Sequence, residues 1–129
     1  MGIVYVIVAS ASEALGLIGA NFYENPSKKL KLIGVTGTNG KTTVASLLFE
    51  LFTAGGYRCG LISTIKILYQ NSKWENSHTT PDALTLNKHL SKMVDSGISH
   101  CFMEVSSHGI AQHRTNGLYF SGGVFTCLL

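Results

Sequence analysis

Charged residues are scarce in this chain. They make up 13% of its 129 residues, whereas hydrophobic residues make up 45%. A disordered chain shows the opposite balance, so the composition indicates a buried core, of a size that suits one compact domain or part of a larger one. The formal charge of +3 is too small and too scattered to suggest nucleic acid as a partner. The basic segment 27–31 is interpreted as a solvated turn.

Cysteine is also rare, and no C-x-x-C pair occurs. Cys59, Cys101 and Cys127 are odd in number and widely spaced, which is typical of reduced, mostly buried thiols and predicts a cytoplasmic location. The hydrophobic start has no basic segment and is too short to span a membrane, and Val6 stands where a myristoylation signal requires Ser or Thr. No membrane association is therefore expected, and residues 3–9 are expected to form a buried strand.

No internal repeat or low-complexity segment is evident, and the hydrophobic pattern alternates between strands and helices. Strands are expected at 30–35, within 58–69, at 98–105 and at 122–129, with the polar segment 70–78 as a hairpin tip or loop and 106–114 as a loop or short helix. Alternating strands and helices predict an α/β fold with a mainly parallel sheet flanked by helices. The segment 25–29 is expected to be a surface linker and the best candidate for a domain boundary.

Three helices are predicted from apolar spacing and from their end signals. The first begins near Ser12 as its cap, buries Leu15, Ile18 and Phe22, and ends before Pro26. The second runs from Lys41 to Gly55 and Gly56, with Val44, Leu47, Leu48 and Leu51 facing inward. The third has Thr80 as its cap, Pro81 at its first position, and residues 83, 86, 90, 93 and 94 on one face.

The segment "TGTNGKTT" (36–43) lies between a predicted strand and a predicted helix, the context of a phosphate-binding P-loop. It misses the strict G-x-x-x-x-G-K-[ST] spacing by one residue, because Gly34 lies six positions before Gly40. Glycines 37 and 40 let backbone N–H groups approach phosphate oxygens, Lys41 supplies a positive charge, and the Thr42 hydroxyl can ligate Mg²⁺. A tight turn with incidental Gly and Lys is the competing interpretation.

A second polar group follows the predicted strand at 98–105. Glu104 lies at the strand's carboxyl end, where ligands bind in parallel α/β sheets, and its carboxylate suits Mg²⁺; a solvent-facing Glu is the alternative. Ser106, Gln112 and Arg114 could recognise an anionic substrate or serve as caps and surface residues. His108 and His113 are weak metal candidates. Thr79 and Thr80 are ambiguous, since a helix cap explains them equally well.

Together, "GVTGTNGKTT", "TTPDALTL", "MEVSSHGIAQHR" and "GGVFT" resemble the Mur ligases of peptidoglycan synthesis, most of all the MurE-type UDP-N-acetylmuramoyl-tripeptide synthetases. In that family T-G-T-N-G-K-T-T is the normal phosphate loop. The resemblance implies that residues 1–26 are the tail of a uridine-binding N-terminal domain and that 27–129 are the first half of the central ATP-binding domain. It also implies an ATP-dependent ligase, monomeric as the whole enzyme, that joins a diamino acid to UDP-N-acetylmuramoyl-L-alanyl-D-glutamate through an acyl phosphate.

The resemblance also implies residue roles. ATP is expected to bind Gly37, Thr38, Asn39, Gly40, Lys41, Thr42 and Thr43, with Thr42 and Glu104 holding Mg²⁺ and with Lys41 and Glu104 as the catalytic pair. The UDP-muramoyl dipeptide is expected to contact Thr79, Thr80, Ser106, Gln112 and Arg114.

Some family features differ or are missing. His78 and Cys127 stand where relatives commonly carry Asn, and the acidic-histidine stretch, the carbamylated lysine and the amino-acid-binding domain are not in this sequence. The chain alone is therefore expected to have no ligase activity. A non-catalytic nucleotide-binding module, another Mur ligase and a folylpolyglutamate synthetase are the alternatives.

Overall fold

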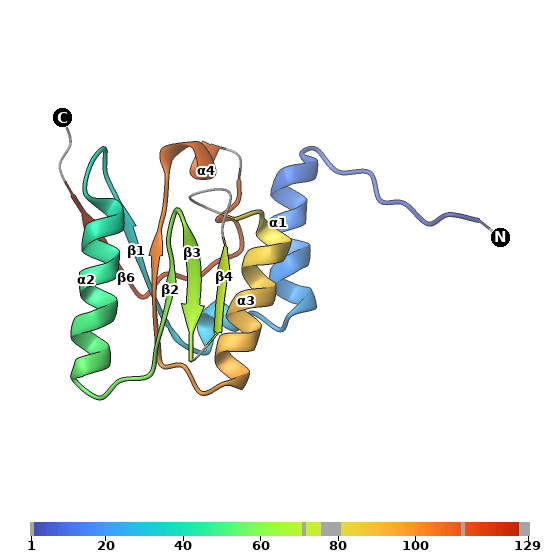
Figure 1. Ribbon diagram of the computed structural model, residues 1–129. Coiled ribbons are helices and arrows are strands. Elements are labelled where there is room, and N and C mark those ends of the chain that lie inside the picture. The colour runs from blue at the N-terminus through green and yellow to red at the C-terminus, as the bar shows by residue number, and fades with distance from the viewer. Residues whose placement is uncertain (1, 71, 76–80, 112, 127–129) are drawn as a thin grey trace.

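The protein folds as a mixed α/β structure with helices on both faces of one sheet (Figure 1). The structure is a computed structural model and describes residues 2–70, 72–75, 81–111 and 113–126. The helices are α1 (Ala11–Phe22), the 3₁₀ turn η1 (Pro26–Lys28), α2 (Lys41–Ala54), α3 (Ala83–Asp95) and α4 (Ser107–Ala111). The strands are β1 (Lys31–Thr36), β2 (Cys59–Ile62), β3 (Lys66–Tyr69), β4 (Ser72–Glu75), β5 (His100–Glu104) and β6 (Gly122–Phe125).

The sheet has the strand order β4-β3-β2-β5-β1-β6. Strands β2, β5, β1 and β6 are parallel, whereas β3 and β4 join the edge as an antiparallel pair. At the centre of the sheet, Val35 of β1 pairs with Glu104 of β5, and Ile62 of β2 pairs with Met103 of β5. The carboxyl ends of β1, β2 and β5 therefore lie at one edge of the sheet, where the loops after them meet.

Successive side chains of a strand point to opposite faces of the sheet, so a hydrophobic core forms on each face. On one face, Phe102 and Val35 pack with Ala45 of α2 and with the partly buried Leu48 and Phe52. The other face is covered by α3, with α1 packed against α3 (Figure 1). That second core includes Leu32, Cys101, Met103, Leu86, Leu90 and Met93. The predicted mainly parallel α/β sheet is confirmed.

The prediction of a buried strand at residues 3–9 is wrong. These residues form no regular element and extend away from the rest of the molecule (Figure 1). Val4 is 94% exposed and Ile7 89% exposed. β-branched residues favour a strand, but a strand forms only where a neighbouring strand pairs with it, and this segment pairs with none of the strands described.

The first helix forms, but its cap and its buried face differ from the prediction. Ser10, not Ser12, caps α1, because its hydroxyl accepts the Glu13 N–H. The buried face consists of Gly16, Gly19 and Ala20, while Leu15, Ile18 and Phe22 are exposed. Small residues are needed there because a Cβ on Gly16 would lie 2.6 Å from the Asn116 carbonyl oxygen. This face of α1 is buried because another segment of the backbone approaches it closely, not because its side chains are large and apolar.

The other helices show smaller differences. In α2 the buried position is Ala45, with Val44 and Leu48 partly buried, whereas Leu47 and Leu51 point to solvent. The α2 helix begins at Lys41 and ends before Gly55, as predicted. In α3 the cap is Asp82, whose carboxylate accepts the Thr85 N–H at 2.9 Å. Pro81 therefore precedes the cap, and Thr80 lies outside the described residues.

Two polar segments are more ordered than predicted. Residues 72–75, expected within a tip or loop, form strand β4, where Trp74 stacks on Tyr69. The expected surface linker is instead η1, where Pro26 and Ser27 are buried. The Ser27 hydroxyl accepts the Tyr119 N–H at 2.9 Å, which ties this turn to the chain before β6.

Cys59 and Cys101 are buried free thiols, as predicted, while Cys127 lies outside the described residues. In the part of the chain that the structure describes, no helix combines the length and apolar character that crossing a bilayer requires.

Candidate functional site

The loop between β1 and α2 is shaped by two glycines with positive φ. Gly37 has φ +135° and Gly40 has φ +83°, conformations that other residues rarely adopt. Gly40 is the N-cap of α2, and its carbonyl accepts the Val44 N–H at 2.9 Å. The free N–H groups of the first helical turn therefore stand at the end of this loop, which is the arrangement that binds phosphate at helix N-termini.

The loop borders a pocket of about 270 Å³ at the carboxyl edge of the sheet. Its lining comprises Thr38, Asn39, Gly40, Lys41, Thr42, Thr43, Thr64 and Glu104. Six of these eight residues come from the predicted phosphate loop. Glu104 comes from the end of β5, and Thr64 follows β2, so three loops that are distant in sequence meet here.

Lys41 lies at the start of α2, and its side chain folds back over the loop. Its Nζ donates to the Gly37 carbonyl oxygen at 2.7 Å. An ammonium has three N–H donors, so one can remain on Gly37 while the others face a ligand. The charge is thus held beside the backbone amides, where an anion would be bound by both.

Glu104 is completely buried, with 0% exposure. Its Oε1 accepts the Thr42 hydroxyl at 2.8 Å and the Thr64 hydroxyl at 3.0 Å, and its Oε2 accepts the Thr64 backbone N–H at 2.7 Å. These three donors fix the orientation of the carboxylate. The alternative that Glu104 faces solvent is wrong, because this carboxylate points into the sheet edge beside the loop.

The donor set fits a magnesium ion held partly by phosphate. Mg²⁺ prefers oxygen ligands and commonly binds one or two carboxylates together with substrate phosphates and water. Because the Thr42 hydroxyl uses its hydrogen on Glu104, its lone pairs remain available as a further oxygen ligand. Among the described residues there is no group of three or more His, Cys, Asp or Glu side chains that could hold a metal by themselves. His113 therefore belongs to no such group of possible metal ligands among the described residues. The His108 side chain is not among those described.

Of the predicted substrate residues, the structure describes Ser106 and Arg114. Ser106 accepts the Gly109 N–H at 2.9 Å, as a residue that caps α4 does. The Arg114 backbone N–H donates to Gly109 at 3.0 Å, so the chain turns back after α4. Both residues follow β5 and lie beyond the pocket lining given above, while Thr79, Thr80 and Gln112 lie outside the described residues.

Two residues of the site were not predicted. Thr64 holds Glu104 through both its hydroxyl and its backbone N–H. Thr126, which directly follows β6, donates from its hydroxyl to the Asn39 carbonyl oxygen at 2.5 Å. The signal for Thr64 is its place directly after "GLIS" at the carboxyl end of a strand, and Thr126 has the same place after β6.

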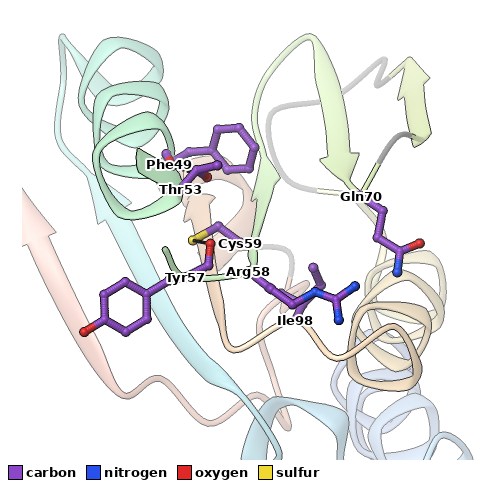
Figure 2. A pocket seen from close by; sticks show the side chains of 7 residues that line it. All are labelled: Phe49, Thr53, Tyr57, Arg58, Cys59, Gln70 and Ile98. Atoms are coloured by element: carbon purple, nitrogen blue, oxygen red, sulfur yellow. Dashed lines mark hydrogen bonds between the residues drawn. The ribbon is translucent and has the colours of Figure 1, made fainter. Parts of the chain in front are cut away.

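A larger pocket of about 530 Å³ lies at the opposite, amino-terminal edge of the sheet. Phe49, Thr53, Tyr57, Arg58, Cys59, Gln70 and Ile98 line it. Figure 2 shows the Tyr57 ring and the Arg58 guanidinium pointing in different directions, so its polar groups do not converge. The residues that line it include no carboxylate, and the strongest nucleophile among them is the Cys59 thiol. Burial raises the pKa of the Cys59 thiol, which keeps it protonated. The site with converging polar groups is the loop pocket.

Comparisons with known proteins agree on one family. The model described as "Mur ligase middle domain" matches residues 35–128. Two curated relatives, from Cytophaga hutchinsonii and Bacteroides fragilis, are 55% and 52% identical over 92% and 98% of this chain. Both are named UDP-N-acetylmuramoyl-L-alanyl-D-glutamate--2,6-diaminopimelate ligase, and the matched region is 24% and 26% of their lengths.

A relative from Clostridium acetobutylicum with the same ligase name is 47% identical over 95% of the chain. A solved structure titled as a UDP-N-acetylmuramoyl-L-alanyl-D-glutamate--2,6-diaminopimelate ligase superimposes with a TM-score of 0.77 at 30% identity. It covers 98% of this chain, which corresponds to 27% of the solved one. The chain thus spans about a quarter of the length of the relatives that it matches.

Proposed function

Since this chain belongs to the Mur ligase family through its middle domain, we propose that it forms the ATP-binding part of an amide ligase of peptidoglycan synthesis. The proposed reaction joins a diamino acid to UDP-N-acetylmuramoyl-L-alanyl-D-glutamate, and the relatives' names support 2,6-diaminopimelate as that amino acid. The parts of the relatives that lie outside the matched quarter would supply the remaining groups. For that reason we expect no ligase activity from the 129 residues alone.

The proposed nucleotide site is the loop pocket. The backbone N–H groups of residues 37–43 would surround the phosphates, and the Lys41 ammonium would neutralise the β- and γ-phosphates. Thr42 and Glu104 would hold Mg²⁺, which neutralises charge on the triphosphate when it is bound. The contact that carries this proposal is the 2.8 Å hydrogen bond from Thr42 to Glu104, because it joins the start of the loop helix to a buried carboxylate inside the pocket lining.

The proposed chemistry is phosphoryl transfer followed by amide formation. A carboxylate oxygen of the muramoyl dipeptide attacks the γ-phosphorus, the bond from that phosphorus to the bridging oxygen breaks, and ADP leaves. The amine of the diamino acid then attacks the acyl carbon, inorganic phosphate leaves, and the amine loses a proton. In the first step the chain's groups have to align two anions and offset their repulsion, which the amides and Lys41 are suited to do.

The proposed substrate contacts are Thr79, Thr80, Ser106, Gln112 and Arg114. Ser106 and Arg114 follow the strand that ends in Glu104, so they lie on the chain segment next to the proposed metal residue. Arg114 suits a carboxylate or a phosphate, because a guanidinium donates two parallel hydrogen bonds. We also propose a cytoplasmic location, a monomeric parent enzyme, and a domain boundary near residue 26.

A chimera tests this function most directly. The matched quarter of the Bacteroides fragilis relative would be replaced by this chain, and ADP release and amide formation would be measured with the dipeptide substrate and diaminopimelate. We expect the chimera to be active, Lys41→Ala to abolish its activity, and Lys73→Ala on the exposed strand β4 to leave it unchanged. A folded chimera that binds Mg·ATP but releases no ADP and forms no amide would contradict the ligase proposal and favour a binding module.

A further inference from the structure

Thr126 connects the edge strand β6 to the loop that follows β1. Its backbone N–H donates to the Thr36 carbonyl oxygen at 2.9 Å, which continues the pairing of the two strands. Its hydroxyl lies 2.5 Å from the Asn39 carbonyl oxygen and 3.2 Å from that of Thr36. The single hydroxyl hydrogen is therefore directed chiefly at Asn39, so this side chain contacts the loop just before Gly40.

These contacts determine where two amides of the loop point. A peptide unit is planar and trans, so the carbonyl of one residue and the N–H of the next point in opposite directions. With the carbonyls of Thr36 and Asn39 directed toward Thr126, the N–H groups of Gly37 and Gly40 point away from β6. The pocket lies on that side, because its lining includes Glu104 from β5 but none of the described residues of β6.

The packing around Gly37 gives independent support. A Cβ added to Gly37 would overlap the Thr126 hydroxyl and would lie 3.1 Å from the Thr126 Cβ. The Gly37 backbone therefore fits directly against this side chain. A loop that moved toward β6 would collide with Thr126, and a loop that moved away would lose the hydrogen bond to Asn39.

We propose that Thr126 is a positioning residue of the nucleotide site, whose hydroxyl orients the Gly37 and Gly40 amides toward the phosphates. This inference rests on the proposed function, since it assumes that the loop binds a nucleotide. Thr126 does not touch the phosphates itself. It acts through the Asn39 carbonyl, and neither the motif 36–43 nor the spacing of its glycines reveals it.

The test uses two variants that differ only in the hydroxyl. Thr126→Ala removes the donor without adding volume, and Thr126→Ser retains it. Thr126→Val serves as a second donor-free variant. Calorimetric titration of the 129-residue chain would use Mg·ATP and inorganic tripolyphosphate, the latter because it probes the loop without a base or sugar. Thermal unfolding of each variant would be recorded, and binding would be measured well below the unfolding transitions.

We expect Thr126→Ala to weaken tripolyphosphate binding by roughly tenfold, as the loss of one organising hydrogen bond implies. Rescue by Thr126→Ser, to within about twofold of wild type, would separate the hydroxyl's role from a general structural one. Wild-type affinity in folded Thr126→Ala, or equal weakening in folded Thr126→Ser, would overturn the inference while leaving the proposed function intact. Failure of the folded wild-type chain to bind either ligand would overturn the proposed function and this inference with it.

Discussion

The Thr42 hydroxyl donates to Glu104 Oε1 at 2.8 Å, although the two residues are 62 positions apart in the chain. The bond joins the first turn of α2 to the last residue of β5, and Thr64 holds the same carboxylate from a third segment. A buried carboxylate is costly unless donors compensate it, so three loops are fixed relative to one another at this point. The loop pocket, our proposed nucleotide site, includes that carboxylate in its lining.

Replacing the carboxylate should remove the effect of magnesium on nucleotide binding. In Glu104→Gln the charge that would attract Mg²⁺ is gone, and the new amide group brings a donor to a place where Thr42 and Thr64 already donate. We expect ATP affinity in this variant to be nearly independent of Mg²⁺, and the stability to fall by about 1–3 kcal/mol. Titrations with and without Mg²⁺, together with urea unfolding, measure the two effects.

Glu50→Gln is the matched control, since Glu50 is an exposed residue of α2. It should keep both the wild-type stability and the wild-type response to Mg²⁺. A folded Glu104→Gln variant with an undiminished magnesium effect would show that Glu104 does not hold the metal.

Substitution of Gly37 should disrupt the loop far more than substitution of an unpacked glycine. Gly37→Ala forces a Cβ into the Thr126 hydroxyl at φ +135°, and we expect a loss of more than about 3 kcal/mol of stability. Gly56→Ala is matched to it, because Gly56 also has positive φ (+94°) but has nothing within 4 Å of an added Cβ. That variant should lose only about 1–2 kcal/mol. Similar losses of unfolding free energy in the two variants would contradict the tight packing of Gly37 against Thr126.

The stability of the fold should fall in mild acid because of His89. Burial, followed by the nearby Lys92 and Lys88, lowers the pKa of His89, and its Nδ1 lies 3.2 Å from the Tyr69 hydroxyl. The unfolded chain, with an ordinary His pKa of about 6.5, binds a proton where the folded chain does not. This stabilising contribution is therefore complete above the unfolded pKa and is lost as the pH falls through the lower, folded pKa.

Urea unfolding at about pH 7.5 and at about pH 5.5 measures this effect. The fluorescence of Trp74, the single tryptophan, reports it directly, because its ring centroid lies 5.2 Å from that of His89. We expect the midpoint to fall in acid, and His89→Phe to show a smaller fall. The same acid response in both proteins would exclude His89 as its source.

The two buried thiols should be unreactive in the folded chain. Burial raises the pKa of the Cys101 thiol and of the Cys59 thiol, so little of the reactive thiolate is present near neutral pH. In a Cys127→Ser background, we expect labelling by a disulfide reagent to be at least roughly 100-fold slower than in urea-unfolded chain, because it requires opening of the sheet. Rapid labelling of the folded chain would mean that the centre of the sheet opens readily.

Much of the fold and of the site could be predicted because the signals are local. The glycine loop, the start of α2 at Lys41 and the end of β5 at Glu104 follow from residue type and short spacing. Parallel strands then bring loop ends together at one edge, so proximity of Lys41, Thr42 and Glu104 could be expected without coordinates. These three residues do lie together in the pocket lining.

The errors concern properties that depend on partners elsewhere in the chain. Residues 3–9 have strand-forming composition but pair with no described strand, and α1 buries Gly16 because Asn116 approaches it closely. Thr64 and Thr126 were missed for the same reason. The place of each directly after a strand marks a position at the sheet edge, but it does not show that the Thr64 hydroxyl meets Glu104 or that the Thr126 hydroxyl meets Asn39.

Binding of Mg·ATP to the 129-residue chain tests the central claim most directly. Calorimetric titration would compare the wild type with Lys41→Ala and with Lys73→Ala as the matched surface control, after circular dichroism has established that each is folded. We predict saturable binding by the wild type and by Lys73→Ala, and a loss of affinity of at least roughly tenfold in Lys41→Ala, since the charge beside the phosphates is removed. A folded wild-type chain that does not bind Mg·ATP, or one whose binding survives Lys41→Ala, would contradict the assignment of this loop as the nucleotide site.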